Sequence, residues 1–217
     1  MKILKILLII GIILPAVLFT SCKKNNETDS KFDGADGKYT DSRDSQVYRW
    51  VKIGEQIWMA ENLNYVTSAS WWYANNPSNG NIYGGLYTWE TALIVCPNGW
   101  HLPSDNEWKT LEMELGMSQS EADSGGDRGN DKGEKLKFTS GWNNNGNGTN
   151  SSGFSALPGG RINNGSFSNL GSYGGWWSSS YYSGSYAWRR YLVSSSDYVG
   201  RGYTDKSTGY SVRCIKN

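Results

Sequence analysis

Residues 96–108 read Cys-Pro-Asn-Gly-Trp-His-Leu-Pro-Ser-Asp-Asn-Glu-Trp, and this stretch decides how the middle of the chain folds. Ser104 followed by Glu107 matches a capping box, in which each side chain satisfies a free backbone N–H at the start of a helix. Apolar side chains then recur at helical spacing as far as Leu115, and Gly116 is a suitable C-terminal stop. The sequence therefore predicts a helix that begins after Ser104 and ends at Gly116.

The segments before this helix predict a second helix and a β-hairpin. Thr88 is a suitable N-cap for a short helix that ends at Cys96. Further upstream, the side chains of residues 47–59 alternate between two faces, and Gly54 stands at the turn between two strands. Residues 66–85 lie between the hairpin and the short helix. They are rich in Asn, Gly and Ser, and we expect them to form a loop.

The segments after the helix predict a long loop and then strands. Residues 117–152 are polar and rich in Gly, Asn and Asp, and connections of that length are usually functional or mobile. From Phe154 onward, short aromatic and β-branched runs are separated by Gly and Ser, which is typical of β-structure. We therefore expect an α+β fold with small antiparallel sheets, two helices and long Gly/Asn-rich loops.

The N-terminal 21 residues have the parts of a bacterial lipoprotein signal peptide. Lys2 and Lys5 give a positive region, and the apolar run over residues 6–19 is short for a membrane span, which needs about 20 residues. Small residues then precede Cys22, as in a lipobox. The sequence predicts removal of residues 1–21 and lipidation (palmitate) of Cys22. An uncleaved anchor helix is the alternative.

After Cys22, the composition predicts a tether and one domain. Residues 22–44 are dominated by Lys, Asn, Asp, Ser and Gly, and such a stretch cannot bury enough surface to offset its ordering entropy. Residues 45–217 are ample for a single domain. We expect an exported protein of the cell envelope, attached by its lipid to the outer membrane and facing the periplasm or the outside.

The charge balance excludes one class of partner. Without Lys2 and Lys5, the 21 basic side chains fall to 19, against 20 acidic ones, so the mature chain has a net charge of −1. Nucleic-acid binding needs a concentrated basic face, which this balance does not favour. We expect no nucleic-acid partner.

The cysteine count predicts a disulfide. With Cys22 lipidated, Cys96 and Cys214 remain, and an exported domain with two cysteines usually pairs them. Two free thiols or a metal-binding pair are the alternatives. His101 is the single histidine of the chain, so a zinc site lacks ligands.

Five motifs in the same order resemble the Fibrobacter succinogenes major paralogous domain, which recurs in Bacteroidetes lipoproteins. The resemblance implies a C-type-lectin-like fold, in the branch that includes formylglycine-generating enzymes. It also implies a disulfide from the end of the first helix to the last strand, where Cys96 and Cys214 stand. The motifs are residues 51–63, 96–108, 153–160, 176–179 and 210–214.

The residues offer little for catalysis or for metal binding. His101 lies between Trp100 and Leu102, where a structural, hydrogen-bonded role is expected, and no second histidine is present to build a Ser-His or Cys-His pair. Formylglycine-generating enzymes use two late cysteines, and only Cys214 is available here. Four acidic residues between Asp123 and Glu134 do not have EF-hand spacing. We expect no enzymatic activity, no cofactor and no metal.

The aromatic residues point to ligand binding. The chain has 11 Trp and 14 Tyr, with adjacent pairs at Trp71–Trp72 and Trp176–Trp177, and neighbours on a strand point to opposite faces. Residues 181–203 combine Tyr and Arg with Ser and Gly, as adaptable recognition surfaces do. We expect a glycan or protein ligand there, with Trp71 and Trp72 as additional contacts. The predicted ligand-binding residues are Tyr181, Tyr182, Tyr186, Arg189, Tyr191, Asp197, Tyr198, Arg201 and Tyr203.

Two other functions remain open from the sequence. One is a structural or adhesive envelope lipoprotein, with mostly buried aromatic residues and no small ligand. The other is an oxidoreductase related to formylglycine-generating enzymes, which requires a reactive thiol. Solvent exposure of residues 181–203 would favour ligand binding over a structural or adhesive role. The absence of a free thiol would argue against the oxidoreductase.

Overall fold

The computed structural model describes residues 36–217. The expected signal peptide over residues 1–21, the lipidation site Cys22 and most of the expected tether lie outside the described residues. Within the described part, no helix is both long and apolar enough to span a membrane.

The ordered domain begins earlier than residue 45, so the predicted boundary of the tether is wrong. Strand β1 (Gly37–Thr40) pairs antiparallel with strand β2 (Val47–Ile53). The turn between them is fixed by the buried Asp41, whose carboxylate accepts hydrogen bonds from the guanidinium of Arg43 at 2.6–3.2 Å. A four-residue strand in a polar segment gives too short a pattern to be recognised from the sequence.

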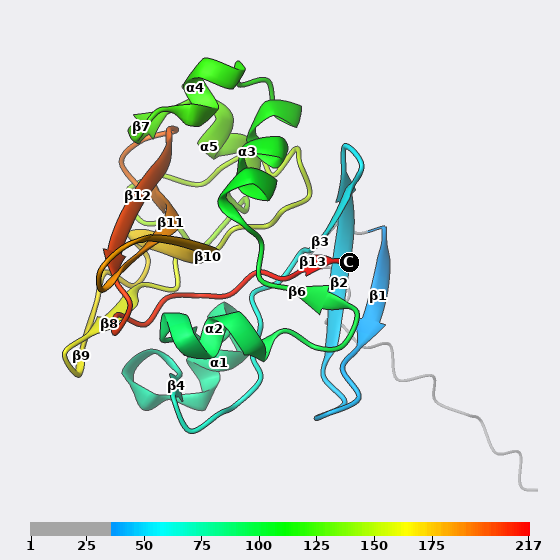
Figure 1. Cartoon of the computed structure of the whole chain (residues 1–217), viewed down its shortest axis with the longest axis vertical. Coiled ribbons are helices and arrows are strands. Elements are labelled where there is room, and N and C mark those ends of the chain that lie inside the picture. The colour runs from blue at the N-terminus through cyan, green and yellow to red at the C-terminus, as the bar shows by residue number, and fades with distance from the viewer. Residues whose placement is uncertain (1–35) are drawn as a thin grey trace, which may run out of the picture. The chain divides into compact units, whose positions relative to one another are not determined.

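The first sheet joins the two ends of the domain. Its order is β1-β2-β3-β13-β6, and the predicted hairpin is confirmed as β2 and β3 (Gln56–Met59), joined at Gly54. Strand β13 (Ile215–Lys216) lies between β3 and β6 (Trp100–His101). The last strand of the chain therefore lies in the same sheet as the first three strands (Figure 1).

The second sheet carries most of the predicted ligand-binding residues. Its order is β10 (Tyr173–Ser183), β11 (Tyr186–Val193), β12 (Val199–Asp205) and β7 (Gly126–Arg128), and all its pairings are antiparallel. It lies on the opposite side of Figure 1 from β1–β3. Two small two-stranded sheets complete the set, formed by β4 (Ser70–Trp71) with β5 (Leu86–Tyr87) and by β8 (Arg161–Asn163) with β9 (Ser166–Ser168).

Both predicted helices are present, as α2 (Trp89–Val95) and α3 (Asp105–Glu114). The side chain of Thr88 caps α2, and the Ser104–Glu107 capping box at the start of α3 is complete. The expectation of only two helices is wrong. The described residues also form α1 (Pro77–Tyr83), α4 (Gln119–Asp123), α5 (Lys132–Leu136) and a 3₁₀ turn, η2 (Tyr73–Asn75).

These additional helices have five to seven residues, which is too short for a helical period to stand out in a sequence. They occupy segments that composition marks as loops. Figure 1 shows α3, α4 and α5 grouped at one end of the molecule, with α1 and α2 at the other end. The fold of the described residues is thus mixed α/β, with several small antiparallel sheets.

Strand β10 separates two hydrophobic cores, because adjacent tryptophans on it point to opposite faces. Trp176, which is 1% exposed, packs in a core with Trp58, Trp108 and Phe154. Trp177, which is 0% exposed, packs in the other core. This confirms the expectation that the two members of the pair do not share one core.

The predicted disulfide is present between Cys96 and Cys214, which are 118 residues apart in the sequence. Cys96 is the C-terminal cap of α2, and Cys214 precedes β13. Cys214 is fully buried in the same core as Trp177. The bond therefore ties the first half of the domain to its last strand.

Candidate functional site

Four aromatic rings form a cluster on one face of the β10–β12 sheet. This aromatic cluster consists of Tyr182, Tyr186, Trp188 and Tyr203, and the register places Trp188 of β11 directly opposite Tyr203 of β12. The rings of Tyr182 and Tyr203 are stacked, with centroids 3.9 Å apart and planes 6° apart. Trp188 stands at 82° and 84° to them, and Tyr186 stands at 78° to Tyr203. Residues from three strands thus contribute to one continuous aromatic surface.

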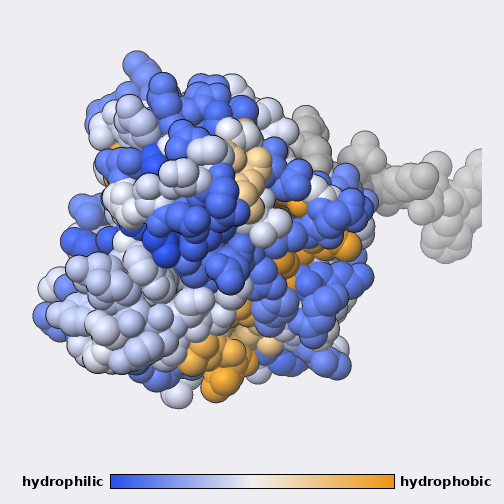
Figure 2. Space-filling model, turned by 45° about the horizontal axis from the view of Figure 1, so that its top comes forward, coloured by the Kyte–Doolittle hydropathy of each residue, from blue (hydrophilic) through white to orange (hydrophobic). Residues whose placement is uncertain are grey.

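Solvent reaches the aromatic cluster. Tyr182 is 39% exposed, Tyr186 43% and Tyr203 49%. The Tyr203 hydroxyl, next to that of Tyr182 in the stacked pair, raises the pKa of Tyr182. The face in Figure 2 shows strongly hydrophobic residues only in small, separate areas. The amphipathic tyrosines are therefore a better candidate for recognition than any purely apolar patch on that face.

Arg201 does not lie on this surface, although the sequence suggested it as a ligand-binding residue. It is only 8% exposed, and its guanidinium is held between the Trp188 ring, 3.9 Å from the ring centroid, and the carboxylate of Asp105. Its Nη2 and Nε donate to Asp105 Oδ2 and Oδ1 at 2.8 and 3.0 Å. Arg201 supports the aromatic cluster from beneath, and it is not available as a ligand anchor.

Arg201 belongs to a buried ionic network between α3 and the β10–β12 sheet. Glu112, which is 0% exposed, accepts from Arg128 Nη2 at 2.5 Å and from Arg190 Nε at 2.6 Å. Arg190 Nη1 also donates to Asp105 Oδ1 at 2.7 Å. Burial alone would raise the pKa of Asp105, but the hydrogen bonds and charges of Arg201 and Arg190 outweigh burial and hold it well below its usual range.

Two other predicted ligand-binding residues, Arg189 and Tyr191, lie on the opposite face of the sheet from the aromatic cluster. They alternate with Trp188 and Arg190 along β11, and successive side chains of a strand point to opposite faces. Burial and a hydrogen bond to Asp127 raise the pKa of Tyr191, whose hydroxyl donates to Asp127 Oδ1 at 2.7 Å. The structure thus divides the predicted surface into two separate regions.

The remaining predicted residues lie outside both regions. Tyr181 is 55% exposed, with Lys206 Nζ 4.6 Å from its ring centroid. Asp197 accepts from Lys137 Nζ at 3.3 Å, and the neighbouring Tyr198 is 42% exposed in the loop before β12. Sequence reasoning missed Trp188 as a site residue. Its position two residues after Tyr186 in a strand could have identified it, because residues i and i+2 share a face.

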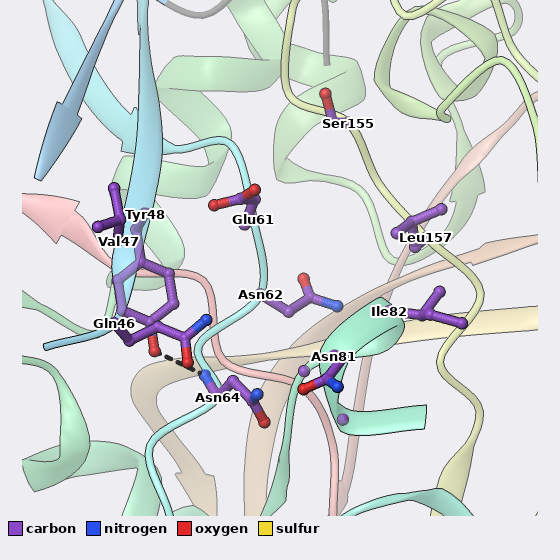
Figure 3. Close-up of a pocket in the computed structure, with 12 residues that line it drawn as sticks. Gln46, Val47, Tyr48, Glu61, Asn62, Asn64, Asn81, Ile82, Ser155 and Leu157 are labelled. Atoms are coloured by element: carbon purple, nitrogen blue, oxygen red, sulfur yellow. Dashed lines mark hydrogen bonds between the residues drawn. The ribbon is translucent and has the colours of Figure 1, made fainter. Parts of the chain in front are cut away.

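A small polar pocket lies between β2, the segment of residues 61–64 and α1 (Figure 3). Tyr48, Glu61, Asn64 and Asn81 are among its lining residues, and the Tyr48 hydroxyl accepts from the backbone N–H of Asn64 at 3.0 Å. Its volume is about 70 Å³. A water needs about 10–15 Å³ of such volume, so this pocket has room for several water molecules.

A second pocket, of about 230 Å³, contains the other tryptophan pair. Tyr65, Trp71, Trp72 and Tyr87 supply its aromatic lining. Trp72 is fixed there because its Nε1 donates to Asn64 Oδ1 at 2.8 Å. The structure therefore brings Trp71 and Trp72 together in one concave site, large enough for a small ring.

His101 is hydrogen-bonded through both ring nitrogens, as expected for a structural histidine. Its Nε2 lies 2.8 Å from Glu107 Oε1, and its Nδ1 lies 2.7 Å from Asn217 Oδ1. These contacts join β6 to the start of α3 and to the C-terminal residue. Across residues 36–217, no three His, Cys, Asp or Glu side chains are grouped in a way that could hold a metal ion.

Comparison with known proteins identifies the domain by its family. Neither the curated proteins nor the solved structures compared with the chain include a match. The family model of the Fibrobacter succinogenes major domain matches residues 51–216. This range begins within β2 and ends in β13, and it includes the disulfide, the aromatic cluster and every residue of the two cores except Tyr48. The chain belongs to the Fibrobacter succinogenes major domain family.

Proposed function

We propose that this protein is a cell-envelope lipoprotein whose domain binds a glycan or a protein ligand, without catalysis. The observation that carries the proposal is the aromatic cluster of Tyr182, Tyr186, Trp188 and Tyr203, three of whose rings are at least 39% exposed. Sugar rings stack on aromatic faces, while tyrosine hydroxyls offer hydrogen bonds. A protein partner would use the same rings as anchors.

The support beneath the cluster favours recognition over an accidental exposure of tyrosines. The ion pair between Arg201 and Asp105 fixes one side of Trp188, and Trp188 in turn contacts Tyr182 and Tyr203. Side chains that are already ordered lose less conformational entropy when a ligand binds. A buried ionic network beneath exposed rings is the arrangement expected of a preorganised surface.

The membrane attachment and the finer fold assignment are part of the proposal. The leader sequence and its Ser21–Cys22 ending support a lipid anchor on Cys22, which would place the domain at the outer membrane. The C-type-lectin-like assignment is supported by the disulfide from the end of α2 to the segment before β13, and by small antiparallel sheets with separate helices.

The two alternatives fit the geometry less well. A structural or adhesive lipoprotein has no need of rings exposed over a fixed ionic support. An oxidoreductase of the formylglycine-generating type needs a free thiol, whereas Cys96 and Cys214 are joined to each other. Activity of that type would require this disulfide to be reduced first.

The proposal is tested by glycan-array and pull-down binding of three proteins. These are the wild type, a Tyr186→Ser/Tyr203→Ser variant that removes two exposed rings, and a Tyr198→Ser control. Tyr198 is exposed to a similar extent but lies outside the aromatic cluster. We expect the double variant to bind at least about 10-fold more weakly, because losing a hot-spot ring costs more than about 1 kcal/mol. Equal binding by all three proteins would refute the site, and no binding by the wild type would favour the structural alternative.

A further inference from the structure

A second cluster lies on the face of the β10–β12 sheet opposite to the aromatic cluster, and it is built around Arg189. The guanidinium carbon of Arg189 lies 4.7 Å from the ring centroid of Tyr191, 5.3 Å from that of Tyr210 and 5.9 Å from that of Tyr173. Its Nη1 also donates a hydrogen bond to the Tyr173 hydroxyl. Three tyrosines therefore surround one cation.

Small residues in the neighbouring strands make room for these rings. A Cβ atom on Gly200 would lie 2.1 Å from the ring of Tyr191, and a Cβ on Gly175 would lie 2.5 Å from Tyr210 and 2.8 Å from Tyr173. The rings can lie flat on the sheet only because these positions are glycine. The cluster is thus formed by several specific positions, rather than by one arginine that happens to be near an aromatic ring.

Arg189 has no anionic partner among residues 36–217, in contrast to its neighbours in the sheet. Arg190 and Arg201 are each paired with Asp105, and Arg128 is paired with Glu112. The Nε of Arg189 is buried and has no hydrogen-bond acceptor within the described part of the chain. A buried donor left without a partner is costly, and native proteins rarely contain one unless a water or ligand supplies the acceptor.

The same place holds another unsatisfied polar atom and another cation. The Tyr210 hydroxyl is buried and makes no hydrogen bond of normal geometry within residues 36–217, although Arg161 of β8 lies beside it. This contact with Tyr210 raises the pKa of Arg161. Arg161 also donates to Ser168 Oγ at 3.4 Å, and no carboxylate of the described residues is paired with it. Two of the three orphaned buried side-chain atoms in the described chain therefore belong to one cluster.

The charge of this cluster defines the ligand that it would accept. Arg161 and Arg189 contribute two positive charges, and both are half-buried, so solvent reaches them. The nearby Asp127 carboxylate accepts from the Tyr191 hydroxyl, and it is not paired with either arginine. Guanidinium groups bind carboxylate, sulfate and phosphate oxygens through two parallel hydrogen bonds.

We propose that Arg189 and Arg161, together with Tyr173 and Tyr210, form a binding site for an oxyanion, the carboxylate, sulfate or phosphate of an acidic ligand. This site is separate from the aromatic cluster, and its existence does not depend on the proposed function of that surface. The alternative is that Arg189 is a purely structural cation packed on tyrosine rings.

The test measures the thermal midpoint of the purified protein against increasing sulfate, phosphate or glucuronate, with sodium chloride at matched ionic strength as the reference. Sulfate and phosphate stabilise most proteins by exclusion from the surface, so the informative quantity is the difference between wild type and Arg189→Gln at each concentration. Arg43→Gln is the matched control, because Arg43 also packs on a tyrosine, at 3.9 Å from the Tyr65 ring, but is paired with Asp41.

We expect a saturable rise of the wild-type midpoint with at least one of the three anions. Arg43→Gln should keep this rise, whereas Arg189→Gln should lose it and Arg161→Gln should need at least a 10-fold higher anion concentration. The anion with the lowest half-saturation identifies the source of the oxyanion. If Arg189→Gln does not fold, Tyr173→Phe takes its place, because it removes one hydroxyl and keeps the ring. An identical response of wild type and Arg189→Gln, or a wild-type response no different from that to chloride, would overturn the proposal.

Discussion

The buried carboxylate of Glu112 offers the sharpest test of how the α3 helix is held to the β10–β12 sheet. Its two oxygens accept from two different arginines, at 2.5 Å from Arg128 Nη2 and 2.6 Å from Arg190 Nε. Glu112→Gln keeps the shape of the side chain but leaves one acceptor oxygen for two guanidinium groups. Asp105 then remains as the carboxylate paired with Arg190 and Arg201, while Arg128 loses its anionic partner.

The expected cost follows from the loss of one partner in a buried ion pair, which is about 3–5 kcal/mol. Urea unfolding, followed by tryptophan fluorescence with the disulfide intact, measures it as a lower midpoint at an unchanged slope. Glu114→Gln is the matched control, because Glu114 is the exposed last residue of the same helix. That control should stay within about 0.5 kcal/mol of the wild type. The reasoning is refuted if the two variants differ by less than about 1 kcal/mol.

Two further predictions concern the disulfide and the response to acid. Replacing Cys96 and Cys214 by alanine should cost about 4–5 kcal/mol in urea unfolding, because the bond closes a loop of 118 residues and limits the unfolded chain; a cost below about 1 kcal/mol would contradict this. The pKa of Asp105 in the folded state is held below its unfolded value of about 3.9, so its contribution to stability is complete above that pH and is lost as the pH falls below it. Urea midpoints measured from pH 6 to pH 2 should fall less steeply below pH 4 for Asp105→Asn than for the wild type, and parallel curves would show that Asp105 is not responsible.

The parts of the fold that were predictable depend on local chemistry. The capping box of Ser104 and Glu107 defines the start of α3 by itself, and the alternation of residues 47–59 defines a hairpin. The pairing of Cys96 with Cys214 follows from arithmetic once Cys22 is assigned elsewhere. The first two signals involve residues that are close in the sequence, and the third involves the number of cysteines. None of them requires knowledge of the tertiary structure.

The parts that were missed depend on contacts between distant segments. Strand β1 has four residues, and it is a strand only because β2 pairs with it. Arg189, Arg190 and Arg201 look equivalent in composition, yet one faces three tyrosines and the other two face buried carboxylates. This distinction depends on the register between β11 and β12. Turn lengths and packing set that register, and the composition of the strands does not reveal it.

The central proposal is that the aromatic cluster binds the ligand. Tyrosine nitration by tetranitromethane, read by mass spectrometry with and without the ligand found in the binding assay, tests it most directly. The account predicts that the ligand lowers nitration of Tyr182, Tyr186 and Tyr203 while Tyr198 reacts as before. Protection of Tyr198 alone, or unchanged nitration of the cluster in a saturated complex, would contradict it.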